Sequence, residues 1–475
     1  MRYAFLCAFL ILMGGIQAEI RSIWVLPWNI QSPQAIDQIV QNAIDSNQNE
    51  LLIEVRYRSD ALYFPNRNNS DFCNPEPRSY ILGNTNFDPL EYSIRKAHQH
   101  GIRIQAWVVV YNATPLLYEQ LHQNYIYRNH HDWLTRDSQG NMMKSREQYG
   151  YFLDPGIPGV QDYLLDVFSD IVVNYPDLDG FHLDYIRYPG KDWGHHPTSI
   201  SRYRTAKISR PMSWNEWRIA QVTDFVQKLR KRLLTLNPQL ILSAAVFPSI
   251  YEARTLYAQD WFDWLNRDLI DYAYPMAYNV KFDVFTRDLD LMLQGDLEDK
   301  IVVGLRAWNT AGKALLHQHS PRYNISHIEE RISHLRSKGF AGIALFSYEG
   351  IIRGSALSVL AERAYSESSL LPELSPTVDL PLSGDILISK VKDAFVLDIV
   401  LPDAGKWTWE LRDHNLAQVY QRFRYYHKGL NRDLFQPTMA NGMPLAPGTY
   451  HLTLLSGDKK HSLQQTLILG NSRYE

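Results

Sequence analysis

An alternation of eight short apolar runs with longer amphipathic segments constrains the fold of this 475-residue chain more than any other feature. The runs are rich in β-branched and aromatic residues, which favour strands, and the segments between them carry apolar residues at helical spacing. Eight strands that alternate with helices predict an α/β fold, the (β/α)8 TIM barrel, with its active site at the C-terminal ends of the strands. The predicted strands are residues 22–28, 50–57, 102–110, 179–188, 240–247, 271–278, 300–308 and 342–348.

Four of the intervening segments begin with a helix-start signal. A Ser or Asp that precedes Pro, or that is followed by Glu three residues later, is typical of an N-cap. Segments 111–158 and 189–212 are unusually long, and because they follow strands at the C-terminal side we expect them to wall the site. The signals are Ser32 with Pro33, Asp88 with Pro89, Ser213 with Glu216 and Ser326 with Glu329.

The pattern of apolar and polar residues changes from about Ser375 onward. Short runs of alternating polarity, such as KWTWELRD and GTYHLTLLSGD, are separated by turn residues. This pattern predicts a small β-sandwich. We therefore expect a barrel over residues 19–370 and a fibronectin-III-like accessory β-sandwich over residues 371–475.

The first 18 residues, MRYAFLCAFLILMGGIQA, have the pattern of a secretory signal peptide, with a positive start, a short apolar run and small residues before Ala18. The run is too short to span a bilayer comfortably, which leaves a retained anchor as the alternative. Cleavage near Ala18 predicts a periplasmic or extracellular bacterial protein without a stable membrane span. It removes Cys7 and leaves Cys73 alone, so we expect no internal disulfide and interpret Cys73 as a shielded loop thiol.

Charge and motif content exclude several classes of partner. The formal net charge is −3 and no run of Lys or Arg is present, so nucleic acid is not an expected partner. The histidine pairs 130/131 and 195/196 lack the i, i+4 spacing of metal ligands, and no Gly-rich phosphate loop occurs. We expect neither a metal nor a cofactor.

Residue parity along the strands predicts which side chains face the barrel lumen, because alternate residues of a strand point inward and outward. We expect Glu54, Arg56 and Arg103, which lie lower on their strands, to satisfy one another in an internal salt-bridge ring. Asp184 lies at the rim, where a carboxyl group can act on a ligand. The other residues expected to face inward are Gln105, Trp107, Tyr111, His182, Tyr272, Tyr274, Met276, Tyr278, Gly304, Arg306 and Trp308.

The surroundings expected for Asp184 are typical of a sugar subsite. Aromatic rings stack on the CH face of a sugar, and a carboxyl group protonates a glycosidic oxygen. The rings expected around this carboxyl group are Trp28, Trp107, Tyr274, Tyr278 and Trp308.

The segment DGFHLDYIRYP (179–189), together with YFLDPG (151–156), QDWFDWL (259–265), DYAYPMAY (271–278) and IRSIWV (20–25), resembles the glycoside-hydrolase-like family ten of secreted bacterial barrel proteins. Members and relatives of that family act on amino-sugar glycans, including peptidoglycan strands stripped of peptides and poly-N-acetylglucosamine. The resemblance implies a similar substrate class, and it implies Asp184 as the leading catalytic candidate.

A weaker likeness to family-eighteen chitinases covers the fourth strand. Their D-G-x-D-x-D-x-E pattern corresponds here to His182 in place of the first inner Asp, to Asp184, and to Ile186 in place of the catalytic Glu. Asp184 would therefore act as proton donor or nucleophile, with Met276 and Tyr278 placed to contact an N-acetyl group.

The second catalytic group is left open by the sequence, because the distance between two carboxyl groups cannot be read from a chain. Glu349 ranks first, ahead of Asp154, Asp260 and Glu252. His182 either bonds Asp184 or the substrate, or is a satisfied core histidine, and Arg187 either fixes Asp184, contacts a substrate carboxylate or forms an outward salt bridge. The predicted substrate-binding residues are Trp28, Arg56, Trp107, Tyr111, His182, Arg187, Tyr274, Met276, Tyr278, Arg306 and Trp308.

Three functions are compatible with these patterns. The first is a secreted hydrolase of amino-sugar glycans that uses carboxylate acid/base chemistry. The second is a non-catalytic glycan-binding or cell-wall-associated protein that uses the barrel cleft. The third is a scaffolding protein whose C-terminal sandwich is the working part.

Overall fold

The computed structural model of the chain describes residues 18–67, 72–115, 118–143, 150–308, 324–353, 356–372, 386–391, 394–401, 405–426, 429–435, 445–456 and 462–469. The chain divides into two compact units, Met1–Pro372 and Glu373–Glu475. The predicted signal peptide, apart from Ala18, lies outside the described residues. None of the described helices combines the length and the hydrophobicity that a membrane crossing needs.

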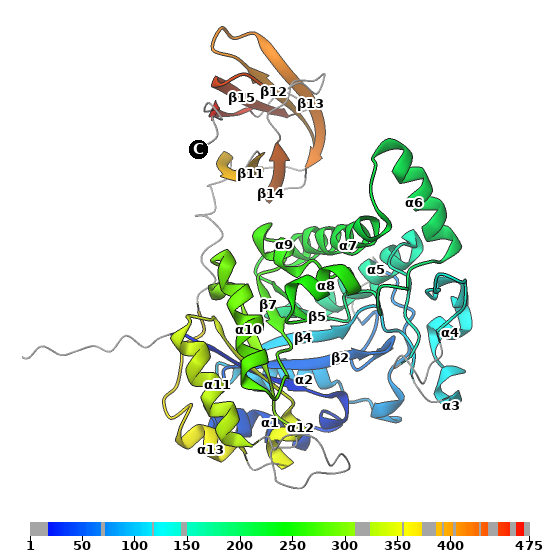
Figure 1. Cartoon of the computed structure of the whole chain (residues 1–475), viewed down its shortest axis with the longest axis vertical. Helices are drawn as coiled ribbons and strands as arrows, with labels where there is room; N and C mark the ends of the chain where they lie inside the picture. The colour runs from blue at the N-terminus through cyan, green and yellow to red at the C-terminus, as the bar shows by residue number, and fades with distance from the viewer. Residues whose placement is uncertain are drawn as a thin grey trace, which may run out of the picture. The chain divides into compact units, whose positions relative to one another are not determined.

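Eight parallel strands form a closed barrel in the first unit. Each strand hydrogen-bonds its neighbours in the order β7-β6-β5-β4-β2-β1-β9-β8, and the parallel bridges Ala273–Ile301 and Met276–Gly304 join β7 to β8. The predicted (β/α)8 barrel is therefore confirmed, and Figure 1 shows its strands within a surround of helices. The strands are β1 (Ile20–Val25), β2 (Glu50–Tyr57), β4 (Arg103–Val109), β5 (Gly180–Asp184), β6 (Ile241–Val246), β7 (Tyr272–Pro275), β8 (Val302–Arg306) and β9 (Gly342–Phe346).

Helices connect these strands, and a two-residue strand, β3 (Asp60–Ala61), pairs antiparallel with the end of β2. Extra helices lie in the long connections that follow β4 and β5, short ones (α3, α4 and η3) after β4 and the 13-residue α6 after β5. The α-helices are α1 (Pro33–Asp45), α2 (Pro89–His98), α3 (Tyr118–Leu121), α4 (Tyr125–Asn129), α5 (Pro158–Asn174), α6 (Pro197–Ser209), α7 (Trp214–Leu236), α8 (Ile250–Tyr257), α9 (Trp261–Asn266), α10 (Phe282–Met292), α11 (Ile325–Ser337), α12 (Tyr348–Arg353) and α13 (Ala356–Glu362). The 3-10 helices are η1 (Pro27–Asn29), η2 (Tyr80–Leu82), η3 (His131–Trp133), η4 (Leu293–Gly295) and η5 (Glu298–Lys300).

Three of the four predicted helix starts are confirmed. The side chains of Ser32, Asp88 and Ser213 each accept a hydrogen bond from a backbone N–H of the first turn, and Ser213 forms the reciprocal capping box with Glu216. The prediction for Ser326 is wrong. Asn324 caps α11 two residues earlier, where its side chain accepts hydrogen bonds from the backbone of the first turn, because Asn is among the best N-cap residues.

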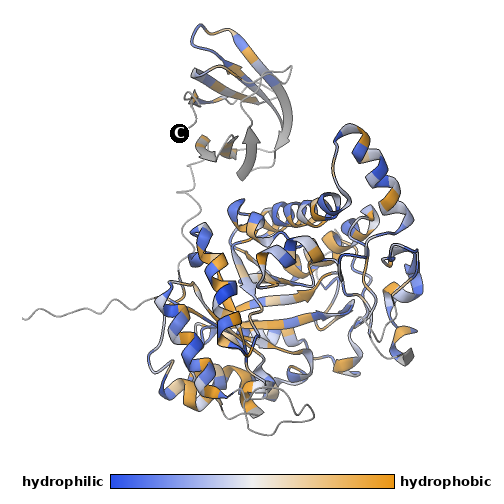
Figure 2. Cartoon of the chain, viewed as in Figure 1, coloured by the Kyte–Doolittle hydropathy of each residue, from blue (hydrophilic) through white to orange (hydrophobic). Residues whose placement is uncertain are grey.

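Two apolar cores lie on either side of the barrel wall. Outward-facing strand residues pack against the helices, and inward-facing residues form a smaller core inside the lumen. Figure 2 shows hydrophobic residues concentrated on the strands and hydrophilic residues on the outer helices. The buried members of the lumen core are Ile20, Trp24, Leu52, Trp107, Ile241, Tyr272, Tyr274, Val302, Ala341 and Ala344.

The lower lumen is built around the buried carboxylate of Glu50. Arg103 pairs with it at 2.5 Å, and Ser22, Gln105 and Tyr274 donate hydrogen bonds to it. Burial opposes the charge, but Arg103 and these hydrogen bonds outweigh it, so the pKa of Glu50 lies below its ordinary value. The expectation that Arg103 belongs to a salt-bridge ring with Glu54 and Arg56 is wrong, because Arg103 pairs with Glu50, which lies beside it on the neighbouring strand.

The second unit is built from two antiparallel sheets. One apolar cluster includes residues of both sheets, such as Phe395 and Ile399 from one and Trp409 and Leu454 from the other, so the predicted β-sandwich is confirmed. Its fibronectin-III-like character stays a prediction. The first sheet contains β10 (Ile386–Val391), β11 (Ala394–Leu401) and β14 (Gly429–Phe435), and the second contains β13 (Gln418–Tyr426), β12 (Gly405–Arg412), β15 (Gly448–Ser456) and β16 (Ser462–Leu469).

Replacing Arg103 with Met should destabilise the barrel, because it leaves the Glu50 carboxylate buried without its cation. We expect a loss of about 3–5 kcal/mol in the free energy of unfolding at neutral pH, measured by urea denaturation. The difference from the parent protein should shrink as the pH falls, because a protonated Glu50 no longer needs Arg103. Arg128→Met, at an exposed position of α4, is the matched control, and an equal loss in both variants would contradict the assignment.

Candidate functional site

Asp184 is the last residue of β5 and lies at the upper end of the lumen. Its Oδ1 atom accepts hydrogen bonds from the Tyr185 backbone N–H at 2.6 Å and from the Arg187 guanidinium at 3.4 Å. About one-tenth of the side chain is exposed (10%), and the hydrogen bonds that Tyr185 and Arg187 donate to this carboxyl group both end on Oδ1. Burial raises the pKa of Asp184, while Arg187 opposes this shift. One oxygen of the carboxyl group is thus held by two donors.

Arg187 is held in place by two aromatic rings. Its guanidinium carbon lies 4.2 Å from the ring centre of Tyr185 and 4.7 Å from that of Phe247. Tyr185 has a φ of 53°, in the left-handed region that a bulky L-residue rarely occupies. This strained turn brings Arg187 back toward Asp184, and strain of this kind is concentrated at functional sites.

Glu54 is a second carboxyl group at the upper lumen, on the inner face of β2. It is 3% exposed, and among the described residues it forms neither a hydrogen bond nor an ion pair. Burial, followed by the charge of Asp184, raises the pKa of Glu54 well above its ordinary value, and Arg58 only partly opposes this. The expected salt-bridge ring around Glu54 is therefore wrong, and its inward position is confirmed.

Trp107 lies between the two carboxyl groups. It is in register with Glu54 on one neighbouring strand and with His182 on the other. Its indole N–H acts on Asp184 and favours the charged carboxylate, although the two groups do not reach hydrogen-bond geometry. Trp107 thus joins the carboxyl pair to an aromatic wall.

That wall is made of rings from four strand ends. The ring centre of Phe346 lies 6.3 Å from that of Trp107, 5.8 Å from Trp308 and 5.6 Å from Tyr278. Tyr278 also contacts Trp308 edge to face at 5.1 Å. Sequence analysis did not single out Phe346, although the inward parity of Gly342 and Ala344 along the same strand is the signal that would have found it.

Met276 and Arg306 border this wall. Met276 and Tyr278 follow β7 and are half-buried. The guanidinium carbon of Arg306 lies 4.7 Å from the ring centre of Trp308, and its Nε donates to the Trp308 carbonyl oxygen at 3.3 Å. Arg306 therefore orients Trp308.

Arg56 and Tyr111 do not face the lumen, so their expected inward placement is wrong. The register between β2 and β4 shifts between Glu54 and Arg56, which turns Arg56 outward onto Glu76 at 2.6 Å. Tyr111 follows the end of β4 and packs against Phe225 of α7 at 5.8 Å. Both side chains are fully buried in the wall.

His182 and Tyr274 face the lumen but lie below the mouth. The Trp24 indole donates to Nε2 of His182 at 3.1 Å, so Nδ1 carries the proton and donates to Ser243 at 2.7 Å. Burial lowers the pKa of His182 to about 3. His182 is therefore a satisfied core histidine, and Tyr274 donates to Glu50 at 2.6 Å in the same network.

Glu349 lies on α12 at the rim, where it accepts a hydrogen bond from the Trp28 indole at 3.0 Å. Trp28 is 44% exposed. The structure thus places Glu349 beside Trp28.

The other acidic candidates have structural surroundings. Asp154 is fully buried and accepts hydrogen bonds from Thr135, Ser199 and the Gly156 backbone. Asp260 pairs with Arg254 at 3.0 Å. Glu252 lies exposed in the first turn of α8.

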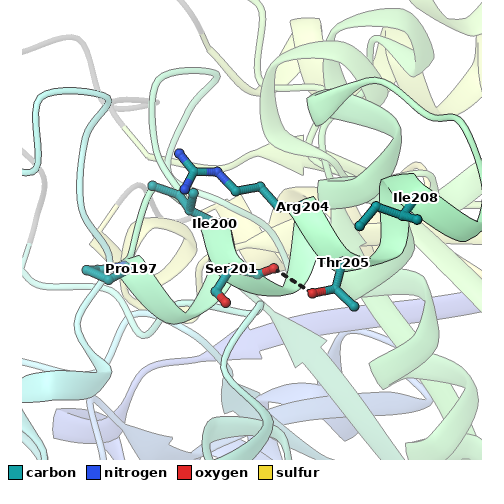
Figure 3. Close-up of a pocket in the computed structure, with 6 residues that line it drawn as sticks. All are labelled: Pro197, Ile200, Ser201, Arg204, Thr205 and Ile208. Carbon is teal, nitrogen blue, oxygen red and sulfur yellow. Dashed lines mark hydrogen bonds between the residues drawn. The ribbon is translucent and has the colours of Figure 1, made fainter.

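The described residues contain no group of three or more metal-ligating side chains. Cys73 is exposed, so its interpretation as a shielded thiol is wrong. An open hollow of about 420 Å³ lies along α6 (Figure 3), and none of its residues comes from a strand end, so we do not assign it to the site. It is lined by Pro197, Ile200, Ser201, Arg204, Thr205 and Ile208.

A closed (β/α)8 barrel with two carboxyl groups and an aromatic wall at the C-terminal ends of its strands has the architecture of a glycoside hydrolase. The chain belongs to the family described as glycosyl hydrolase-like 10, whose model matches residues 19–306. The resemblance drawn from the sequence is therefore confirmed.

Curated relatives cover part of the chain. Two proteins named glycosyl hydrolase DigH, from Escherichia coli K12 and from E. coli O6:H1 strain CFT073, are each 24% identical over 222 residues, which are 41% of this chain and 47% of theirs. The chain spans about half the length of the curated relatives it matches.

Solved structures with similarity to the chain include two glycosidase domains. The catalytic domain of β-amylase from Paenibacillus polymyxa is 9% identical, with 73% of this chain and 99% of that domain covered and a TM-score of 0.47. The catalytic domain of chitinase B from Arthrobacter TAD20 is 10% identical, with 75% and 99% covered and a TM-score of 0.44.

His182 should stay neutral across the physiological pH range, because burial disfavours its cation. With ¹⁵N-labelled histidine, NMR should show the Nδ1–H form of this ring from neutral pH down to about pH 4.5, far below its ordinary value of roughly 6.5. Loss of the signal in His182→Gln assigns it. A titration midpoint near the ordinary value would show that the lumen network is assigned wrongly.

Proposed function

We propose that this protein is a secreted glycoside hydrolase that cleaves amino-sugar glycans, with the Asp184 carboxyl group taking part in the reaction. The observation that carries the proposal is the position of Asp184, which is buried at the upper lumen with one oxygen, Oδ1, held by Arg187 and by the Tyr185 N–H. A carboxylate held in this way can stabilise positive charge, accept a proton or form a bond at an anomeric carbon.

The aromatic wall supports a sugar as the ligand. Tyr278 and Trp308 are half-buried and meet edge to face beside the lumen, and so part of each ring stays open to a ligand. Sugar rings present CH faces that pack on such surfaces, and the hydroxyl groups remain free for polar contacts. Arg306 fixes the orientation of Trp308, which makes the wall a preformed surface.

An amino sugar fits the apolar part of this surface. Met276 and Tyr278 lie two residues apart just after the end of β7, and they offer the kind of apolar contact that the acetamido methyl group of an N-acetylated sugar requires. The substrates that follow from the family resemblance are peptidoglycan strands stripped of peptides and poly-N-acetylglucosamine. Export rests on the signal-peptide pattern of residues 1–18.

Replacing Asp184 with Asn should reduce turnover by about 10²–10⁴-fold, because the amide neither accepts a proton nor carries the charge. The measurement is the release of reducing ends and short oligosaccharides, identified by mass spectrometry, from peptide-free peptidoglycan strands and from poly-N-acetylglucosamine. The Asn side chain preserves the shape of the carboxyl group, so we expect the fold and the binding of glycan to persist.

Asp283→Asn, on the exposed first turn of α10, is the matched control and should turn over substrate like the parent protein. Full activity of Asp184→Asn would remove Asp184 from the reaction. Glycan binding by the parent protein with no product from either polymer would favour the binding-protein alternative.

A further inference from the structure

We propose that Glu54 is the proton donor of this site and the catalytic partner of Asp184. The inference rests on the proposed glycosidase function and deepens it, because it names the second carboxyl group that the reaction requires. It replaces Glu349, which ranks first on sequence grounds.

The barrel register brings Glu54 and Asp184 to the same part of the lumen. Glu54 is paired in register with Trp107, and Trp107 is paired with His182, two residues before Asp184. The two carboxyl-bearing strands are thus separated by one strand, or about 10 Å between backbones, and inward side chains converge from there. Their carboxyl groups interact electrostatically. This arrangement suits the separation of roughly 5–9.5 Å found between the paired carboxyl groups of glycosidases.

A purely structural carboxyl group in this position would be paired with a cation or with hydrogen-bond donors. Four residues earlier on the same face of β2, Glu50 has an arginine and three hydrogen-bond donors. Glu54 has no such partners among the described residues. Leaving a buried polar group without partners costs stability, and such groups are concentrated at sites of chemistry.

The surroundings raise the pKa of Glu54 more strongly than that of Asp184. Burial and the charge of Asp184 raise the pKa of Glu54 well above its ordinary value, which favours its protonated form. Burial also raises the pKa of Asp184, but Arg187 and the Tyr185 N–H stabilise its charge. Two carboxyl groups whose environments separate their pKa values are typical of an acid and its charged partner. The other groups that act on the pair are Arg58, Tyr185, Trp107 and Tyr278.

The chemical step follows from these states. Glu54 delivers its proton to the bridging oxygen while the bond from that oxygen to the anomeric carbon breaks, and the electron pair of the bond stays on the oxygen. Asp184 faces the developing positive charge as a carboxylate. Water supplies the new bond to the anomeric carbon, and the proton that water releases returns the carboxyl pair to its one-proton state.

The test compares Glu54→Gln on two substrates. On poly-N-acetylglucosamine, whose leaving group needs a proton, we expect turnover to fall by about 10²–10⁴-fold. On a 2,4-dinitrophenyl glycoside of N-acetylglucosamine oligomers, whose leaving group departs without a proton, we expect a loss of less than about tenfold. The alkaline decline of the parent pH profile should also disappear in the variant, because it reports deprotonation of Glu54.

Glu330→Gln, at an exposed position of α11, is the matched control. Glu54→Asp keeps a carboxyl group on a shorter side chain and should retain partial activity with the alkaline decline present, which covers the case in which Glu54→Gln does not fold. Equal losses of Glu54→Gln on both substrates, or no loss on either, would overturn the role of Glu54. A parent protein that cleaves neither substrate would instead remove the proposed glycosidase function.

Discussion

The cost of placing a charge inside the barrel lumen governs how the interior of this protein is arranged. β2 carries two carboxyl groups on the same inner face, Glu50 and Glu54. The lower one, Glu50, is ionised, because Arg103 and the neighbouring hydrogen-bond donors offset the free-energy cost of its burial. The upper one lacks such partners in the described part of the chain, and burial raises its pKa well above the ordinary value. One strand thus contributes a compensated structural carboxylate at one level and a carboxyl group of raised pKa at the next.

Much of the fold was predictable because the signals are local and repeated. Strands buried on both faces and capped helices leave their patterns in short segments, and eight repetitions leave little choice of architecture. Parity along the strands also identified Trp107, His182, Asp184 and Tyr274 as inward residues, since the side-chain period of a strand is fixed. Sequence analysis was less able to predict the height of each inward residue along the barrel axis.

The failures have particular causes. Parity fails at Arg56 because the pairing of β2 and β4 shifts after Glu54, and at Tyr111 because β4 has already ended. Arg56 then pairs with Glu76, which lies in a loop twenty residues away. No periodic pattern in the sequence predicts such a partner. Sequence analysis placed Glu54 in a salt-bridge ring that does not form, and it therefore assigned Glu54 a structural role. Its role becomes visible only when the partners of Glu50, Arg56 and Arg103 are all assigned.

The hydrogen-bond network of the lower lumen also fixes the positions of the residues at the mouth of the barrel. The inward residue next above Gln105 on β4 is Trp107, and the one next above His182 on β5 is Asp184, a step of about 6.6 Å along each strand. Gln105 and His182 are joined through Ser243, so the two strands cannot slide past each other without breaking that chain of hydrogen bonds. The hydrogen-bonded polar groups of the lower lumen therefore hold Glu54, Asp184 and the strained turn at Tyr185 in register above them. Stability and chemistry are divided along the barrel axis, and each strand of the site contributes to both.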